Sequence, residues 1–503
     1  MSSLFFVFFR LFLPPCILCL FPLIIPNMYD FTHPVSSVSL PIGSVSLGLF
    51  RDSFSDCADF RVRTVSAPGE RPCHALWLEG CISGGDAMRN VLQPLSSLSL
   101  SPPLRAIRRI LSGSALGPAV TLCRTAEEAL AALPGGSVVL LFDSVGVALA
   151  LEEKTAARRA VTEPTVEKTV LGAKDAFTET LRTNTSLLRR RMRTPKLKLR
   201  EFTLGARTKT AVDLLYIEGS APTALTDALS GLLSSSGDTD ILTTGDLERL
   251  LSASPRGAFP RACHTERPDR FLQGLLSGQA GLLVDNIPVG LLLPGTLPEL
   301  MRVGEDSARH AVVARSLAVL RTIALFVSLL LPSLYVAVAM YHPEMIPYEL
   351  LLSVIESKQA VPFSTAAEVL GMLLAFEFLQ EAGIRLPESI GQTVSVIGAL
   401  IVGQSAVDAR VLSPIVIIVV AVAGIAGYTV PSQELSSALR LWRFLLVLAA
   451  MALGAFGIMA ALCVLFWRLC DAESFSRAYL YPLCDGDRPY FRRLFPRREE
   501  KRP

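Results

Sequence analysis

Residues Leu317–Met340 read LAVLRTIALFVSLLLPSLYVAVAM, and this stretch decides the class of the protein. It carries a single charge, Arg321, close to its start. At 1.5 Å per residue such a helix covers about 36 Å, whereas the hydrocarbon core of a bilayer is about 30 Å thick. We therefore predict that this stretch spans a membrane.

Three more apolar stretches follow it and pass the same test. Ile390–Val407 and Val411–Val430 contain no charge, and Leu441–Trp467 contains only Arg443 near its start. The region Leu317–Trp467 holds 15 charged residues in 151, and the rest of the chain holds 93 − 15 = 78 in 352. This distribution predicts a soluble region ahead of an all-α transmembrane bundle.

The composition excludes several classes of function. The chain is 51% hydrophobic and 18% charged, and its net charge of +3 is too small to favour a nucleic-acid partner. It contains no P-loop, dinucleotide-binding glycine fingerprint, H-E-x-x-H or G-x-S-x-G motif. Cys16 and Cys19 form a C-x-x-C without the second ligand pair of a zinc site. We expect no enzymatic activity, no cofactor and no metal.

An acidic segment lies between the first two clear spans. It carries Glu368, Glu377 and Glu381 among apolar residues, and a carboxylate at the centre of a bilayer costs about 2.5–3.5 kcal/mol. Glu377 and Glu381 share one helical face, and Arg385 follows Glu381 by four residues. We interpret the segment as a re-entrant or short helical pair that lines a cation pathway. An interfacial amphipathic helix with solvated acids is an equal alternative.

Two other residues of this region are candidates for the same pathway or its gate. Pro332 removes a backbone hydrogen bond inside the first span and would kink it. Gln404 offers a polar tie between helices in an otherwise apolar stretch. Ordinary helix packing explains both residues as well.

The soluble region contains two similar stretches. HALWLEGCISGGDAMRNVLQPLSS from His74 and DLLYIEGSAPTALTDALSGLLSS from Asp213 each give an apolar strand, Glu-Gly, a turn and an amphipathic helix. Each is followed by a glycine and, seven residues later, an aspartate, in Gly136 to Asp143 and in Gly278 to Asp285. We predict two tandem α/β subdomains of similar design. Chance similarity of two generic strand-turn units is the alternative.

A basic connector, predicted to be helical, separates the two subdomains. Its arginines Arg189, Arg190 and Arg191 could contact lipid headgroups or an acidic partner. The alternative is a solvated helix whose arginines pair with Glu167, Asp175 and Glu179. The predicted divisions are an apolar leader, which could be non-native or a signal anchor, at 1–27, a first α/β subdomain at 58–165, the connector at 166–205, a second α/β subdomain at 206–300, a basic linker at 301–316, the transmembrane domain at 317–468 and a basic tail at 469–503.

Charges beside the spans predict their orientation. Arg302, Arg309, Arg315 and Arg321 crowd the entry to the first span, which favours a cytoplasmic N-terminal region. The tail from residue 468 carries nine Lys/Arg and six Asp/Glu, which favours a cytoplasmic C-terminus. Four spans plus a re-entrant pair satisfy both, but they leave Arg440 and Arg443 on the outer side.

Several ordered strings make the chain resemble the GerA family of spore germination receptor A subunits. They include YHPEMIPYELLLSVIESKQAVPF, the stretch from EFLQEAGIRLPESIGQ to GIAGYTVP, LLVDNIPVGLLLP, TERPD, NTSLLRRRM and WLEG, and they cover roughly residues 59–482. The chain departs from the family pattern at 171–177, which reads LGAKDAF, and at Glu305-Asp306-Ser307-Ala308, where the family has Glu-Asp-Tyr-Tyr.

The resemblance implies a receptor subunit in the inner spore membrane, with its soluble region on the cytoplasmic or spore-core side. It implies a transporter-like B subunit and a lipoprotein C subunit as partners, and a ring of A subunits whose membrane helices conduct monovalent cations. Two other functions stay open: a secondary transporter-like permease, and a non-conducting scaffold subunit of the receptor. A transporter is typically built from inverted repeats with broken helices in both halves, and the sequence shows only one broken segment.

Overall fold

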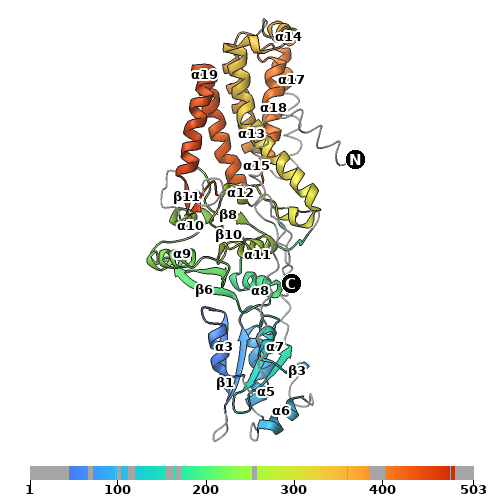
Figure 1. Cartoon of the computed structure of the whole chain (residues 1–503), viewed down its shortest axis with the longest axis vertical. Coiled ribbons are helices and arrows are strands. Elements are labelled where there is room, and N and C mark those ends of the chain that lie inside the picture. Colours follow the sequence, from blue (N-terminus) through green and yellow to red (C-terminus); the bar gives the residue numbers. More distant parts are fainter. Residues whose placement is uncertain are drawn as a thin grey trace, which may run out of the picture. The chain divides into compact units, whose positions relative to one another are not determined.

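The computed structural model describes residues 45–65, 72–96, 98, 103–111, 119–152, 164, 167, 169, 172–251, 258–359, 361–385, 403–475 and 477–481 (Figure 1). The chain divides into two compact units. Residues 29–255 and 261–294 belong to the α/β unit, and residues 256–260 and 295–503 belong to the helical unit. The predicted leader at 1–27 lies outside the described residues.

The first half of the α/β unit, which we call repeat 1, is built on a five-stranded antiparallel sheet of order β1-β2-β4-β5-β3. Its elements are α3 (Leu47–Ser53), β1 (Phe60–Val65), β2 (Cys73–Leu78), α4 (Gly84–Ala87), the π-helical turn η2 (Met88–Leu92), α5 (Gln93–Ser96), α6 (Pro103–Leu111), β3 (Ala119–Cys123), α7 (Ala126–Ala132), β4 (Ser137–Phe142) and β5 (Val147–Glu152).

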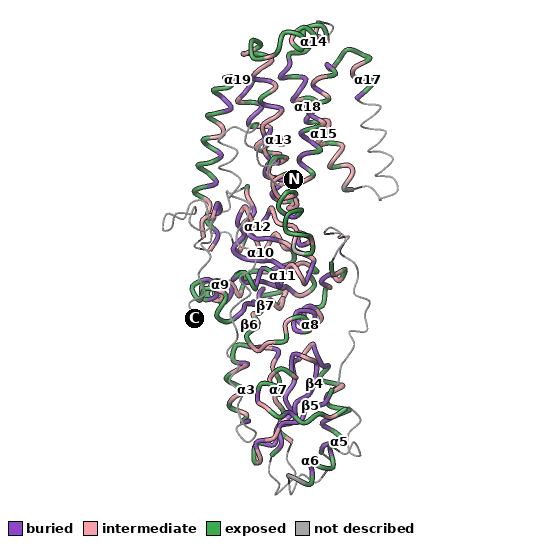
Figure 2. The backbone as a smooth tube through the Cα atoms, turned by 45° about the vertical axis from the view of Figure 1, so that its right-hand side comes forward, coloured by how far each residue is buried: buried purple, intermediate pink, exposed green. Residues whose placement is uncertain are grey.

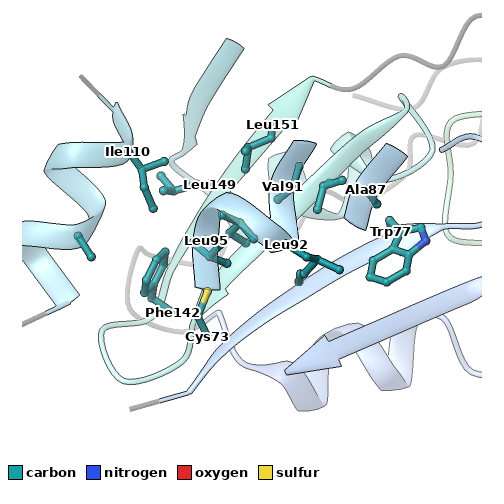
Figure 3. Packing of buried hydrophobic residues seen from close by; sticks show 14 of the residues in the cluster. Cys73, Trp77, Ala87, Val91, Leu92, Leu95, Ile110, Phe142, Leu149 and Leu151 are labelled. Atoms are coloured by element: carbon teal, nitrogen blue, oxygen red, sulfur yellow. The ribbon is translucent and has the colours of Figure 1, made fainter. Parts of the chain in front are cut away.

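Helices cover both faces of this sheet, because its central strands are apolar on both faces along most of their length. One core joins Trp77 and Leu140 of the sheet to Val91, Leu95 and Ile110 of the helices on that side (Figure 3). A second core joins the alternate strand residues to α3 and α7. β4 is buried along its whole length (Figure 2), as expected of a strand with a core on each face.

The second half of the α/β unit, repeat 2, has a five-stranded antiparallel sheet of order β6-β7-β9-β10-β8. Its elements are α8 (Leu181–Arg191), β6 (Leu197–Leu204), β7 (Thr210–Ile217), α9 (Thr223–Ser235), α10 (Thr244–Leu251), β8 (Cys263–Thr265), α11 (Pro268–Leu276), β9 (Ala280–Val284) and β10 (Gly290–Leu293).

The two repeats correspond element by element and share their strand register. Leu140 pairs with Leu149 in repeat 1, and Leu282 pairs with Leu291 in repeat 2, so both residues of the pair are displaced by 142 positions. Gly136 and Gly278 both adopt a positive φ, of 86° and 87°. The prediction of two tandem α/β subdomains is confirmed.

The aspartates singled out in the sequence have the same place in each repeat. Asp143 follows β4 and accepts a hydrogen bond from the backbone N–H of Leu47, the first residue of α3, at 3.4 Å. Asp285 follows β9 and accepts one from the N–H of Leu181, the first residue of α8, at 3.1 Å. A carboxylate at a helix N-terminus satisfies a free donor and opposes the helix dipole. Each aspartate therefore fixes the helix that opens its repeat.

The second sheet begins earlier than the sequence division suggested. β6 starts at Leu197, so the predicted connector at 166–205 contains this whole strand, and the second subdomain begins before the predicted residue 206. The helical part of the connector is α8, which ends at Arg191. The alternating pattern of LKLREFTL is that of an edge strand, and the basic residues before it obscured that pattern.

The helical unit begins with α12 (Leu297–Leu300) and the 3₁₀ turn η3 (Gly304–Ala308). Its other elements are α13 (Ala311–Tyr341), the 3₁₀ turn η4 (Pro343–Met345), α14 (Tyr348–Lys358), α15 (Thr365–Arg385), α17 (Gly403–Asp408), α18 (Pro414–Tyr428), α19 (Gln433–Asp471) and the short strands β11 (Glu473–Ser474) and β12 (Arg477–Ala478). Among the described helices, α13 and α19 are long and apolar enough to cross a membrane. Most of the predicted span Ile390–Val407 lies outside the described residues.

The predicted span Leu441–Trp467 is not one straight helix, because α19 reverses at Gly454. That glycine has φ 60° and ψ −137° inside the helical run. Trp442 and Tyr479 both lie beside Phe259, with ring centroids 6.5 Å and 5.9 Å away, although a straight helix would hold the two ends of α19 far apart. α19 is therefore a helical hairpin whose two ends lie at the same end of the helical unit, and Figure 1 shows its two arms side by side.

The helix that carries the acidic residues is also longer than the sequence predicted. α14 is a short and largely exposed helix (Figure 2), whereas α15 is a single helix of 21 residues and extends past the short apolar run from which it was predicted. At 1.5 Å per residue α15 covers about 32 Å. Its length is compatible with a membrane crossing, but its charges make its composition less apolar than that of α13.

Candidate functional site

Glu377 forms an ion pair between helices that are distant in the sequence. Its carboxylate lies 3.1 Å from the guanidinium of Arg440 on α19, and each side chain is 23% exposed. Arg440 is also fixed by the hydroxyl of Ser437, which accepts a hydrogen bond from it at 2.8 Å. The sequence suggested a local partner for the acidic face of this helix, with Arg385 four residues after Glu381. The structure instead gives Glu377 a partner from a distant helix, Arg440 of α19.

Arg443 lies one turn after Arg440 and is only 3% exposed. It donates a hydrogen bond to the hydroxyl of Ser328 on α13. Gly427 of α18 makes room for it, because a methyl group on that glycine would come within 3.1 Å of the guanidinium. The first arm of α19 is therefore tied to α15 by Arg440 and to α13 by Arg443.

The predicted kink residue Pro332 belongs to this same site. Pro332 is buried inside α13 and has no backbone N–H, so it leaves the carbonyl of Ser328, four residues earlier, without its helical donor. The hydroxyl of that serine is the group that receives Arg443. The guanidinium of Arg443, from α19, therefore contacts the turn of α13 that Pro332 ends.

Glu368 has a different environment from Glu377. It is 1% exposed and accepts a hydrogen bond from the backbone N–H of Ser413 at 2.8 Å. Ser413 is the N-cap of α18, so the carboxylate of Glu368 opposes the positive end of that helix dipole. Its second oxygen is buried and has no hydrogen-bond partner among the described residues.

The remaining residues predicted for this pathway lie apart from the charged cluster. Glu381 is exposed on α15, on the same stripe as Phe378. Gln404 is exposed on α17, and the chain just before it lies outside the described residues. The structure therefore joins Glu377 and Pro332 through α19 and leaves Glu368, Glu381 and Gln404 in separate surroundings.

The start of α13 is fixed by charged residues that follow the soluble region. Arg321 is 9% exposed, and its guanidinium donates hydrogen bonds to Asp306 and to the carbonyl of Met301. Arg309 pairs with Glu305 at 3.0 Å. Glu305 and Asp306 keep ionic roles here, although Ser307 and Ala308 replace two aromatic residues of the family pattern.

The arginines of α8 do not form one surface patch, which corrects the proposal that Arg189 contacts headgroups or partners. Arg189 is 1% exposed and binds both carboxylate oxygens of Asp59 in repeat 1 at 2.9 Å. Its third hydrogen bond goes to the carbonyl of Leu197 at 2.7 Å. Arg191 pairs with Asp175, as the alternative interpretation expected, and Arg190 is exposed.

A second buried charge cluster lies under α8 in repeat 2. Asp213 is fully buried in β7, and Arg182 of α8 lies 3.7 Å from it while also binding Glu201 of β6. Burial raises the pKa of the Asp213 carboxyl to about 7, while the Arg182 charge opposes that rise. Glu201, Asp59 and Asp285 raise the pKa further through their negative charges.

Sequence reasoning missed the partners of the acidic residues. Arg440, Arg443 and Asp59 carry much of the buried charge, and no local pattern joined them to Glu377 or Arg189. One signal was present for α19, because Arg440 and Arg443 are the two basic residues near the start of an otherwise apolar stretch. The predicted topology left both arginines on the outer side of the membrane, against the usual distribution of basic residues. A reversal of α19 removes this inconsistency.

Comparisons with known proteins relate almost the whole chain to one family. The family model "Bacillus/Clostridium GerA spore germination protein" matches residues 49–502. The chain is 34% identical to the uncharacterized membrane protein YfkQ of Bacillus subtilis (strain 168), over 84% of this chain and 82% of that protein. It is 31% identical to spore germination protein KA of Bacillus subtilis (strain 168), over 85% and 79%.

Another relative and a solved structure are also similar to the chain. Spore germination protein B1 of Bacillus subtilis (strain 168) is 33% identical, over 81% of this chain and 84% of that protein. Among solved structures, the N-terminal domain of the A subunit of the Bacillus megaterium spore germinant receptor GerK3 aligns with a TM-score of 0.39 and 23% identity, covering 51% of this chain and 98% of that domain.

Proposed function

Because the chain belongs to the GerA family of spore germination proteins, we propose that it is the A-type membrane subunit of a spore germination receptor and that several copies form a germinant-gated cation channel. The proposal includes a transporter-like B subunit and a lipoprotein C subunit as partners. It places the receptor in the inner spore membrane, where release of monovalent cations would start germination.

The observation that carries the channel proposal is the charged interior of the helical unit. Glu377, Arg440 and Arg443 lie between helices whose outer faces are apolar, including Leu445, Phe456 and other exposed residues of α19. Ionised groups in a membrane domain are costly and mark ion pathways or structural pairs. The described helices of one chain are too few to enclose a pore, so the proposal requires a ring of subunits.

The orientation proposed here has the α/β unit on the cytoplasmic or spore-core side. Both ends of α19 lie at one end of the helical unit, which puts Arg440 and Arg443 at the end where Arg309 and Arg315 enter α13. Basic residues at the cytoplasmic end of membrane helices are the usual arrangement.

The test is cation release from spores whose gene encodes the triple variant Glu368→Gln, Glu377→Gln and Glu381→Gln. A channel lined by these helices predicts an altered rate or selectivity of K⁺ and Na⁺ release after germinant addition, at wild-type protein abundance. Purified protein in K⁺-loaded vesicles checks that the flux belongs to this subunit. Unchanged flux and selectivity would argue against a role in the pore.

A non-conducting scaffold subunit is the second candidate, and one observation favours it. Two of the three candidate glutamates have structural partners, since Glu377 is paired with Arg440 and Glu368 caps α18. A scaffold predicts that vesicles containing this subunit alone stay impermeant, while its loss removes the partner subunits from the spore membrane. Quantifying the B and C subunits in membranes without this chain separates the two functions.

A further inference from the structure

We propose that the ion pair between Glu377 and Arg440 is a latch that holds α15 against α19 in the closed state of the channel, and that opening requires its release. This inference rests on the proposed channel function and specifies the regulation of the same site.

The geometry makes the pair a direct link between α15 and α19. Glu377 and Arg440 are 63 residues apart in the sequence, and their charged atoms lie 3.1 Å from each other. Both side chains are mostly removed from solvent, which strengthens the attraction relative to a pair in water. Ser437 holds Arg440 in the orientation that meets the carboxylate.

In the described structure the carboxylate of Glu377 is not free to bind a metal cation. Arg440 already neutralises it, and Arg443 adds a second positive charge one turn further along α19. A metal cation that approached Glu377 would have to displace Arg440 while being repelled by Arg443. The cation pathway can therefore use Glu377 only after α15 and the first arm of α19 have separated.

The packing of α15 allows such a separation. Phe376, next to Glu377, fits against Gly424 of α18, where a methyl group would come within 2.5 Å of the ring. The opposite face of α15 is exposed at Gly371, Leu374 and Phe378. α15 is therefore held against α18 by Glu368 at its start and by Phe376, and against α19 by the ion pair. Its other face is available to neighbouring subunits, and release of the ion pair frees the half of α15 that follows Phe376.

The test compares four variants of the full-length protein with wild type in K⁺-loaded vesicles without germinant. Glu377→Gln and Arg440→Gln each remove one partner, and the double variant Glu377→Arg with Arg440→Glu reverses the pair while keeping the net charge. Glu356→Gln is the control, because it removes an exposed carboxylate of the same helical unit, on α14, that the proposed pathway does not use.

The latch predicts that either single variant raises the K⁺ leak roughly fivefold or more, since conformational couplings of 1–3 kcal/mol change populations by about that factor. The reversed pair should return the leak to the wild-type level, and Glu356→Gln should leave it unchanged. A leak that is unaffected by the single variants, or one that stays high in the reversed pair, would overturn the latch.

A second measurement separates failure of the latch from failure of the channel proposal. Hydrogen exchange of α15 in detergent reports its attachment to α19 whether or not the protein conducts. Faster exchange in Glu377→Gln that the reversed pair restores supports the latch, even if no preparation passes K⁺. Equal exchange in all variants contradicts it, even if the wild-type protein conducts.

Discussion

Single residues of the α/β unit show how burial decides the role of a charge. Arg189, Arg190 and Arg191 are consecutive, but they are respectively buried against Asp59, exposed, and paired with Asp175. A run of arginines in the sequence does not show which of them are exposed. Their exposure depends on how α8 packs against the two sheets. Because Asp59 lies 130 residues before Arg189, no local pattern could assign that pair.

Asp213 gives a prediction about the pH dependence of stability. Its pKa is about 7 in the folded protein, mainly because burial disfavours the charged carboxylate, and 3.8 is its ordinary value. The folded state thus binds the proton more tightly than the unfolded chain does. The stability that this protonation contributes is fully present below pH 3.8, and it is lost as the pH rises through about 7.

We therefore expect Asp213→Asn to remove this part of the pH dependence. The variant should gain stability relative to wild type as the pH rises from 4 to 7, by up to about 4 kcal/mol for a shift of this size. The measurement is the unfolding of repeat 2 in the detergent-solubilised chain, followed by hydrogen exchange between pH 4.5 and 8. A difference between variant and wild type that is the same at every pH would contradict the prediction.

The elements show which parts of the fold are readable in the sequence. The two repeats were found because their strands, turns and helices follow one another in a fixed local order, with Gly136 and Gly278 at the same step. The reversal of α19 was missed because LAAMALGAFGIMAAL is as apolar as a straight span, and Gly454 is one of several glycines. Only the left-handed conformation of that glycine distinguishes a hairpin from a continuous helix.

The hairpin predicts a specific effect of a single methyl group. Gly454→Ala should disrupt the turn, because the residue has φ 60° and a Cβ atom would lie 2.9 Å from the ring of Tyr341. The left-handed conformation alone costs roughly 1–3 kcal/mol for an ordinary residue. We expect lower abundance in the membrane and a lower melting temperature in detergent.

The control for this prediction is another helical glycine in the same unit. Gly371 lies in α15, and a Cβ atom there would meet nothing within 4 Å. Gly371→Ala should leave the protein unchanged or slightly more stable, since alanine favours a helix over glycine by about 1 kcal/mol. Equal behaviour of the two variants would show that α19 does not turn at Gly454.

At the scale of the helical unit, the hairpin fixes where the chain returns. The backbone N–H of Leu297, ahead of α13, donates a hydrogen bond to the carbonyl of Tyr479, beyond α19. Tyr341, at the far end of α13, donates one to the carbonyl of Met451, just before the reversal. Residues 297 and 479 therefore lie at one end of the helices, and residues 341 and 451 lie at the other.

This arrangement predicts the accessibility of introduced thiols in sealed membrane vesicles. The thiols from His310→Cys and Glu473→Cys should react with an impermeant maleimide from one side, and the thiol from Glu344→Cys should react from the other. Peptide mass spectrometry distinguishes them from the natural cysteines. Joint labelling of the 473 and 344 positions from one side would instead indicate a straight α19.

The candidate site depends on contacts across the whole unit, which explains why its acids were found and its bases were not. Glu377 and Pro332 were conspicuous because a charge and a proline are unusual in apolar helices. Their partners Arg440 and Ser328 come from helices whose relative packing is set by tertiary contacts such as Gly424 with Phe376 and Gly427 with Arg443. The sequence identifies unusual residues, and the assembled helices determine which of them meet.

The shared register of the two repeats has a consequence for synthesis of the chain. A newly made β6 or β7 meets strands of repeat 1 that have the same hydrogen-bonding order, so exchange of strands between repeats is a hazard. Glu201 and Asp213 find Arg182 only when β6, β7 and α8 of repeat 2 assemble together, whereas repeat 1 places Thr64 opposite His74. A wrongly exchanged strand would bury a carboxylate without its arginine, and this penalty would return each strand to its own sheet.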